Sequence, residues 1–165
     1  MRNAPTGGAI FTVELPLSAG DPHEEASEAP VASDWLSDKK ILIVDDERHI
    51  RRFLQQALGS SGCQVEVASN RNEALEMVMK NSFDLIIYDY KLPDGTGKDL
   101  ARDILALDHT MADRMLLITG DSLAPETNAY VSRVPHVLMK PFDLPALQSA
   151  LRTIIAAQDT AEISR

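Results

Sequence analysis

Two adjacent aspartates, Asp45 and Asp46, follow the apolar stretch KILIV at residues 40–44. Neighbouring carboxylates repel one another, so their charge must be offset by helix N–H groups or by a cation. The pair can therefore begin the helix that follows, or it can hold a positively charged partner. Taken alone, these two residues leave both interpretations open.

Polar residues end three further apolar stretches of the chain. Asp89 follows FDLIIY (83–88), Thr119 follows RMLLI (114–118) and Lys140 follows HVLM (136–139). The carboxyl ends of parallel strands lie along one edge of a sheet, and open α/β sheets bind their ligands there. We therefore expect these side chains to converge on one site with the aspartate pair.

Aspartates, a hydroxyl and a lysine at one sheet edge can carry out phosphoryl transfer. A single lysine cannot balance three carboxylates, whereas Mg²⁺ held by oxygen ligands can. A carboxylate can act as a nucleophile and form an aspartyl-phosphate. The metal and the lysine would then neutralise the phosphoryl group, and the hydroxyl would hydrogen-bond one of its oxygens.

The elements that must position these residues alternate regularly along the chain. Helical patterns separate five apolar stretches, one of which is CQVEVA at residues 63–68. Near-continuous apolar strands that alternate with helices predict an α/β fold. Because crossover connections are right-handed, the expected architecture is a five-stranded, doubly wound parallel sheet with helices on both faces.

Composition excludes several classes of function. The chain has 165 residues and a formal net charge of −9, which argues against nucleic-acid binding. Its single cysteine, Cys63, rules out an internal disulfide and a cysteine-based metal site. No apolar run approaches the roughly 18 residues of a membrane span, and the N-terminus has no signal-peptide pattern. We expect a cytoplasmic protein whose present fragment makes no membrane contact.

Four motifs, VDDE, YDYKLPDGTG, LLITGD and LMKPFD, occur in this order between residues 39 and 158. With this order and spacing the chain resembles the receiver domain of two-component response regulators, which implies a flavodoxin-like fold with strand order 2-1-3-4-5. The resemblance also implies a cis Lys140–Pro141 bond and a set of site residues. These are Asp89 as the phosphoacceptor, Asp46 as a direct Mg²⁺ ligand, Asp45 as a ligand through water, the carbonyl of Lys91 as a further ligand, and Thr119 and Lys140 as the groups that bind the phosphoryl group.

The resemblance further implies a role in a phosphorelay. The domain would take a phosphoryl group from a phosphohistidine on a histidine kinase or a histidine phosphotransfer protein, with Mg²⁺ as cofactor. It would catalyse its own phosphorylation and dephosphorylation rather than act as a separate enzyme. A homodimer is a further partner arrangement that stays open.

Two residues, Val137 and Lys91, bear on alternative functions. Val137 stands three residues before Lys140, where the family often has a switching Tyr or Phe. A threonine-to-aromatic relay cannot operate there in its usual form, which favours the alternative of a pseudo-receiver, a protein-binding module without phosphate turnover. A metal-dependent phosphatase would use the same nucleophile but needs a second acid two residues later, where this chain has Lys91.

Residues before the receiver-like region indicate a larger parent protein. The stretch GGAIFTVELPL (7–17) is similar to the closing strand of the ATPase domain of sensor histidine kinases, so residues 1–17 are interpreted as the end of such a domain. Residues 18–38 hold six acidic side chains and no Lys or Arg, which is typical of a linker. We therefore expect the C-terminal piece of a hybrid sensor kinase, with a receiver at 39–158 and a polar tail at 159–165.

Overall fold

The structure is a computed structural model that describes residues 2–3, 9–10, 34–120 and 125–163. The chain divides into two units, Met1–Val31 and Ala32–Arg165. In the first unit, β1 (Arg2–Asn3) pairs with β2 (Ala9–Ile10) in antiparallel fashion. The rest of the kinase-like strand predicted over residues 7–17, and the linker up to residue 33, lie outside the described residues.

The second unit is built on a five-stranded parallel sheet. Its strands are β3 (Lys40–Val44), β4 (Gln64–Ala68), β5 (Leu85–Asp89), β8 (Met115–Thr119) and β9 (Val137–Met139). They lie in the order β4-β3-β5-β8-β9. Counted along the chain within this sheet, the order is 2-1-3-4-5, so the predicted fold is confirmed.

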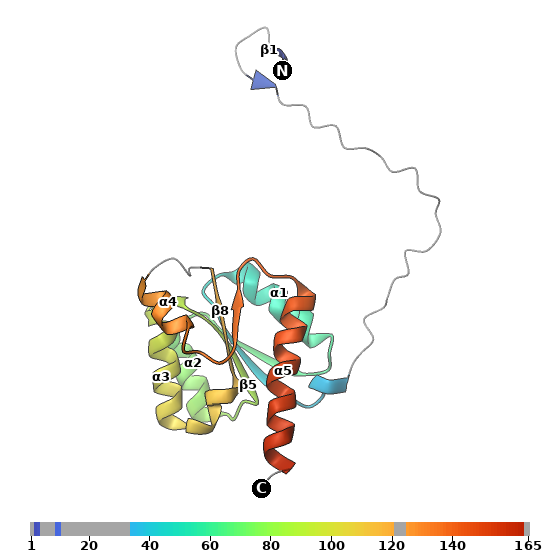
Figure 1. The fold of residues 1–165 in the computed structure, drawn as a ribbon, viewed down its shortest axis with the longest axis vertical. Coiled ribbons are helices and arrows are strands. Elements are labelled where there is room, and N and C mark those ends of the chain that lie inside the picture. The colour runs from blue at the N-terminus through green and yellow to red at the C-terminus, as the bar shows by residue number, and fades with distance from the viewer. Residues whose placement is uncertain (1, 4–8, 11–33, 121–124, 164–165) are drawn as a thin grey trace, which may run out of the picture. The chain divides into compact units, whose positions relative to one another are not determined.

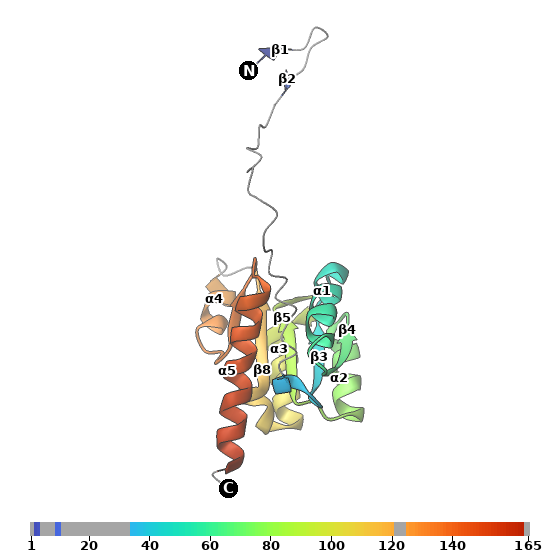
Figure 2. The same ribbon diagram turned by 90° about the vertical axis from the view of Figure 1, so that its right-hand side faces the viewer.

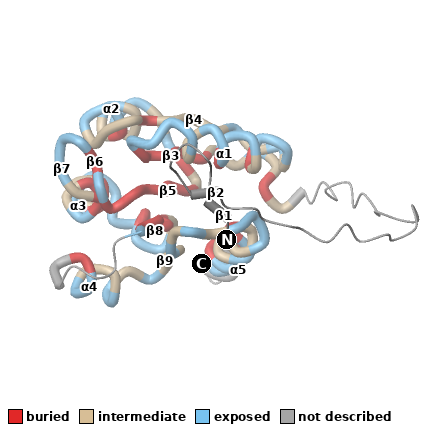
Figure 3. The backbone as a smooth tube through the Cα atoms, turned by 90° about the horizontal axis from the view of Figure 1, so that it is seen from above, coloured by how far each residue is buried: buried red, intermediate tan, exposed pale blue. Residues whose placement is uncertain are grey.

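Helices cover both faces of the sheet, as Figures 1 and 2 show. They are α1 (Arg48–Gly59), α2 (Arg71–Lys80), α3 (Gly97–Leu107), α4 (Pro125–Val131) and α5 (Leu144–Ile163). Alternate side chains of a strand point to opposite faces. Accordingly, Ile41 and Ile43 of β3 pack in the core with α1 and α5, whereas Leu42 and Val44 pack in the core with α2 and α3. Figure 3 shows the central strands buried between helices with exposed outer surfaces.

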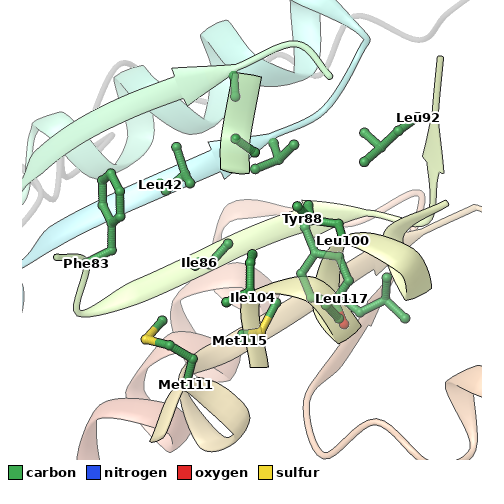
Figure 4. Close-up of a cluster of buried hydrophobic side chains, with 14 of the residues drawn as sticks. Leu42, Phe83, Ile86, Tyr88, Leu92, Leu100, Ile104, Met111, Met115 and Leu117 are labelled. Carbon is green, nitrogen blue, oxygen red and sulfur yellow. The ribbon is translucent and has the colours of Figure 1, made fainter. Parts of the chain in front are cut away.

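The core between the sheet and α3 is shown in Figure 4, where Ile86, Tyr88 and Leu117 from the strands meet Leu100 and Ile104 from the helix. The helix starts at a capping box. The side chain of Thr96 accepts a hydrogen bond from the Asp99 backbone, and the Asp99 side chain accepts one from the Thr96 backbone. This cap fixes where α3 begins, directly after the hairpin of β6 (Lys91–Leu92) and β7 (Gly95–Thr96).

The packed domain begins before residue 39, where the sequence placed its boundary. Asp34–Leu36 form a turn of 3-10 helix, and the side chain of Leu36 is 0% exposed in the core on the α1–α5 face. Next to it, the Arg152 guanidinium lies 4.5 Å from the centre of the Trp35 ring, a cation–π geometry. The acidic composition of the preceding stretch concealed the buried Leu36 from prediction.

Two helices differ in length from the prediction. The tail predicted at 159–165 is helical as far as Ile163, because α5 continues beyond the receiver-like pattern. Near this end, the buried Gln158 amide donates a hydrogen bond to the Asp84 carbonyl at 3.3 Å.

A second 3-10 helix at His109–Arg114 precedes β8. The sequence also indicates a helix over 121–133, and within the described residues this helix is the shorter α4. Across the described residues, no helix combines the length and apolarity needed to cross a membrane.

Truncating Leu36 tests the position of the domain boundary. Leu36→Ala should lower the free energy of unfolding by about 2–4 kcal/mol, since it opens a cavity in a fully packed region. Leu107→Ala is the matched control, because that side chain is 57% exposed and its loss should cost less than about 0.5 kcal/mol. Urea denaturation followed by circular dichroism measures both. Equal, small effects would show that residue 36 is not part of the folded domain.

Candidate functional site

The ammonium group of Lys140 lies among three carboxylates at the carboxyl edge of the sheet. Its Nζ donates to Asp89 Oδ2 at 2.8 Å, to Asp45 Oδ2 at 3.0 Å and to Glu47 Oε1 at 3.2 Å. A lysine ammonium has three N–H donors, so each can serve one carboxylate. Residues from three separate parts of the chain are thereby joined into one charged cluster.

Strand ends place these groups, as the spacing in the sequence predicts. Asp45 directly follows β3, Asp89 is the last residue of β5 and Thr119 is the last residue of β8. All three are buried, and Lys140 directly follows β9. The Lys140 backbone N–H donates to the Thr119 carbonyl at 2.9 Å, which fixes the lysine beside the end of β8. The Lys140–Pro141 peptide bond is cis, as expected.

The sequence left open whether the aspartate pair begins a helix or holds a cation. The two carboxylate oxygens of Asp45 have different partners, one for each of these roles. Oδ1 accepts a hydrogen bond from the Glu47 backbone N–H at 2.7 Å, in the turn that leads into α1. Oδ2 accepts from Lys140. The guanidinium of Arg51 also donates to the Asp45 backbone carbonyl. The first aspartate of the pair therefore supports the helix start and holds a cation at the same time.

Burial and charge pairing shift the pKa values of this cluster. Burial raises the pKa of Asp45, and its hydrogen bonds with Lys140 and Glu47 offset that rise only in part. Burial alone would lower the pKa of Lys140, but its hydrogen bonds and attraction to Asp89 and Asp45 outweigh this and raise the pKa well above its ordinary value. Lys140 therefore stays protonated at neutral pH, whereas burial makes the charged form of Asp45 less favourable than it is in water.

A close approach of backbone behind Asp89 requires glycine at position 97. A Cβ atom added there would lie 2.3 Å from the Asp89 carbonyl oxygen and 2.9 Å from the Tyr90 Cα. Real Cβ contacts are never this short. The Gly97 N–H also donates to the Tyr90 carbonyl at 2.7 Å. The start of α3 is thus pressed against the end of β5, which fixes the backbone that carries the Asp89 carboxylate.

The loop after Asp89 is tied to a second helix by Asp94. The Asp94 carboxylate accepts from the backbone N–H groups of Arg71 and Asn72 at 2.8 and 2.9 Å, at the first turn of α2. Arg71 pairs in turn with Asp103 on α3. These contacts connect α2, α3 and the loop, so hydrogen bonds and an ion pair hold the loop that follows Asp89 in place.

Three carboxylates in this cluster have the geometry of a cation site. Asp45, Glu47 and Asp89 each offer one oxygen, and these atoms all lie within 4.8 Å of one another. Hard oxygen donors at this spacing fit Mg²⁺. Glu47 was not among the predicted ligands, although the run VDDE shows a third acid directly after the aspartate pair.

The remaining predicted ligands are placed differently. The side chain of Asp46 is exposed and is not one of the three clustered acids. Lys91 lies in β6, two residues beyond Asp89. The roles predicted for the Asp46 carboxylate and the Lys91 carbonyl therefore stay predictions. Val137, the position of the missing aromatic, lies in β9 and packs half-buried against the core on the α2–α3 face.

Comparison with known proteins decides the family. The family model described as the response regulator receiver domain matches residues 41–152. The chain belongs to this family. Two curated relatives illustrate its range. The response regulator protein PilR of Pseudomonas aeruginosa is 34% identical over 73% of this chain, and the sensor histidine kinase RcsC of Salmonella typhi is 32% identical over 86% of it.

These curated relatives are much longer proteins, since the matches cover 27% of PilR and 15% of RcsC. Solved receiver structures match over almost their full length. A CheY-like receiver domain from Methanospirillum hungatei superimposes with a TM-score of 0.69 at 28% identity, covering 76% of this chain and 99% of that one. The response regulator TrrA of Thermotoga maritima, in complex with Mg²⁺ and BeF, gives 0.61 at 27% identity, covering 70% of this chain and 98% of TrrA.

Substituting Gly97 tests whether backbone packing holds Asp89 in place. Gly97→Ala should destabilise the domain by more than about 2 kcal/mol, because backbone atoms must move apart to admit the methyl group. Gly59→Ala is the matched control, since a Cβ there meets nothing within 4 Å, and this helical position should gain up to about 1 kcal/mol. Urea unfolding compares the two. A neutral Gly97→Ala would contradict the close packing.

The raised pKa of Asp45 predicts a stabilising substitution. A carboxyl whose pKa is raised on folding costs stability once pH exceeds its ordinary value, so Asp45→Asn should stabilise the domain at pH 7 by about 1 kcal/mol. This gain should shrink as the pH is lowered toward 3.8, where the wild-type carboxyl is neutralised too. Thermal unfolding across this pH range measures it.

Asp108→Asn is the control of opposite sign. The hydroxyl and backbone N–H of Thr110 hydrogen-bond the Asp108 carboxylate and lower its pKa, so this charge stabilises the fold at neutral pH. That variant should be less stable than the wild type at pH 7, and the loss should fade in acid as the carboxyl is protonated. A destabilised Asp45→Asn protein at pH 7 would contradict the account of the cluster.

Proposed function

We propose that this domain is a phosphoacceptor in a two-component phosphorelay, which takes a phosphoryl group from a phosphohistidine onto Asp89. The observation that carries the proposal is the pairing of the buried Asp89 carboxylate with Lys140 at 2.8 Å, beside a second buried carboxylate on Asp45. Buried acids with perturbed pKa values and a specific charge partner cluster at functional sites. Membership of the receiver family supports the proposal.

The transfer itself is a displacement at phosphorus. A carboxylate oxygen of Asp89 forms a bond to phosphorus as the bond from phosphorus to the imidazole nitrogen of the donor breaks, and the bonding electron pair returns to the imidazole. With a proton on the other ring nitrogen of the donor, the imidazole leaves as a neutral histidine, and the other product is an aspartyl-phosphate. Hydrolysis of the acyl phosphate then returns Asp89 to a carboxylate and releases inorganic phosphate.

The chain's own residues would assist by placing charge and donors around the moving group. Lys140 already lies within hydrogen-bond distance of Asp89, so its ammonium can follow the negative charge onto the phosphoryl oxygens. Thr119, at the end of the adjacent strand, is placed to offer its hydroxyl. Asp45, Glu47 and Asp89 would hold Mg²⁺, which when bound neutralises charge on the phosphoryl group. The Mg²⁺ and BeF complex of TrrA supports this metal requirement.

We further propose that the domain is the C-terminal receiver of a hybrid histidine kinase. The match to RcsC covers 86% of this chain, whereas residue 41 to the end makes up about three quarters of it. The similarity to that sensor kinase therefore includes residues before the receiver. The kinase-like pattern at 7–17 supports the same parent, with the histidine kinase or a phosphotransfer protein as phosphoryl donor.

A pseudo-receiver that binds partners without accepting phosphate is the second candidate. Val137 favours it, since the usual aromatic switch is missing. The assembled cluster of Lys140 with Asp45 and Asp89 favours the phosphoacceptor, because a module without phosphate chemistry would have no need to keep buried charges.

Phosphorylation of Asp89 is tested directly with a small-molecule donor. Incubation with Mg²⁺ and acetyl phosphate should add the mass of one phosphoryl group to the wild-type chain, and EDTA should prevent it. Asp89→Asn should remove the modification, because the amide is not a nucleophile of this kind. Intact-mass spectrometry measures both.

Asp113→Asn is the matched control, an exposed aspartate in the 3-10 helix before β8 that should leave labelling unchanged. Labelling that persists in Asp89→Asn would move the acceptor elsewhere. A wild-type chain that accepts no phosphoryl group, and whose partner binding is the same with Asp89→Asn, would favour the pseudo-receiver.

A further inference from the structure

Three tyrosines link the acceptor strand to α4. Tyr88 and Tyr90 stand on either side of Asp89 in the sequence, and Tyr130 lies on α4. The hydroxyl groups of Tyr88 and Tyr130 are hydrogen-bonded at 2.8 Å. The rings of Tyr90 and Tyr130 have their centres 5.9 Å apart and are tilted by 40°. One side chain on α4 therefore contacts both neighbours of the acceptor.

The hydrogen bond between the two hydroxyls is partly buried, at the edge of the core. Tyr88 is 2% exposed, and Figure 4 shows its ring beside Leu100 and Leu117. A buried hydroxyl that loses its partner is costly, so a displacement of one tyrosine favours a matching displacement of the other.

The helix that carries Tyr130 is a short one. It spans only Pro125–Val131, and its described anchors in the core are few: the buried Thr127 and the half-buried Tyr130 and Val131. Elements with few buried contacts have low local stability and are drawn into conformational change. Val137 of β9 packs against the same core cluster as Tyr130, and its small side chain leaves the aromatic contacts of this region to the tyrosines.

We propose that Tyr130 couples Asp89 to α4, so that phosphorylation of Asp89 changes the position of this helix through Tyr88 and Tyr90. This inference rests on the proposed phosphoacceptor function. A phosphoryl group adds charge and volume at Asp89, and the peptide that follows it carries Tyr90. The contact of Tyr90 with Tyr130 transmits that displacement, and the hydroxyl pair of Tyr88 and Tyr130 sets which arrangement α4 adopts.

The coupling is reciprocal. If phosphorylation of Asp89 changes the affinity of a partner for α4 by some factor, binding of that partner must change the equilibrium constant of phosphorylation by the same factor. Tyr130 thereby gives this chain an output route that needs no aromatic residue at position 137.

The test follows the backbone amides of the full 165-residue chain by NMR during titration with Mg²⁺ and beryllofluoride. In the wild type, amides at Tyr90 and Lys91 report the acceptor site, and amides at Asn128–Val131 report α4. Both sets should shift. In Tyr130→Phe the acceptor amides should respond with an affinity within about twofold of wild type, whereas the α4 shifts should fall by about half or more.

Matched variants separate the hydroxyl pair from other effects. Tyr88→Phe removes the other hydroxyl and should reduce the α4 response to the same extent, and the double variant should lose no more than either single one. Tyr90→Phe keeps its ring beside Tyr130 and should respond as wild type. Because the two single variants report the same bond, a folding defect in one leaves the other to decide.

The two proposals fail in different ways. If the acceptor amides respond but α4 shifts fully in Tyr130→Phe, or if the losses of the two tyrosine variants simply add, the coupling is wrong and the phosphoacceptor stands. If the wild-type acceptor amides do not respond at all, the proposed function fails and the coupling falls with it.

Discussion

The ion pairs of Lys140 with Asp45 and Asp89 join the ends of three separate strands into one charged cluster. Removing carboxylates from water is expensive unless each is paired and hydrogen-bonded, and here the lysine and the Glu47 backbone N–H meet that need. The balance is incomplete, however, because one ammonium faces three acids. Under the proposed function, the remaining negative charge would attract a divalent ion, and that ion would offset the charge of a phosphoryl group.

The rest of the domain keeps these charges at fixed distances. A parallel sheet sets the strand ends side by side, and cores on both of its faces prevent the strands from shifting. Gly97 then brings the start of α3 against the Asp89 backbone, and Asp94 fastens the following loop to α2. The site is therefore pre-organised by packing, which is the condition under which electrostatic groups assist phosphoryl transfer most.

The sheet and the polar residues at its edge could be predicted from the sequence, because each strand has a strong local pattern of apolar residues. The buried strands are apolar runs, so their number, parallel arrangement and polar ends follow from the sequence, and Asp45, Asp89, Thr119 and Lys140 come with them. Leu36 and the last turns of α5 escaped prediction, because acidic or polar surroundings hide a single buried contact. Glu47 and Tyr130 escaped for another reason. Their importance lies in contacts with Lys140 and Tyr88 across the fold, and no periodicity in the sequence reports such pairs.

The most direct test of the account is the affinity of the site for Mg²⁺ with and without the lysine, measured by isothermal titration calorimetry. Lys140 competes with the metal for the same carboxylates, so Lys140→Met should tighten Mg²⁺ binding by about tenfold, as removal of one unit charge a few ångströms from a divalent ion would do. The exposed Lys80→Met, at the end of α2, should leave it unchanged. Unchanged or weaker Mg²⁺ binding in Lys140→Met would contradict the claim that lysine and metal share one acidic cluster.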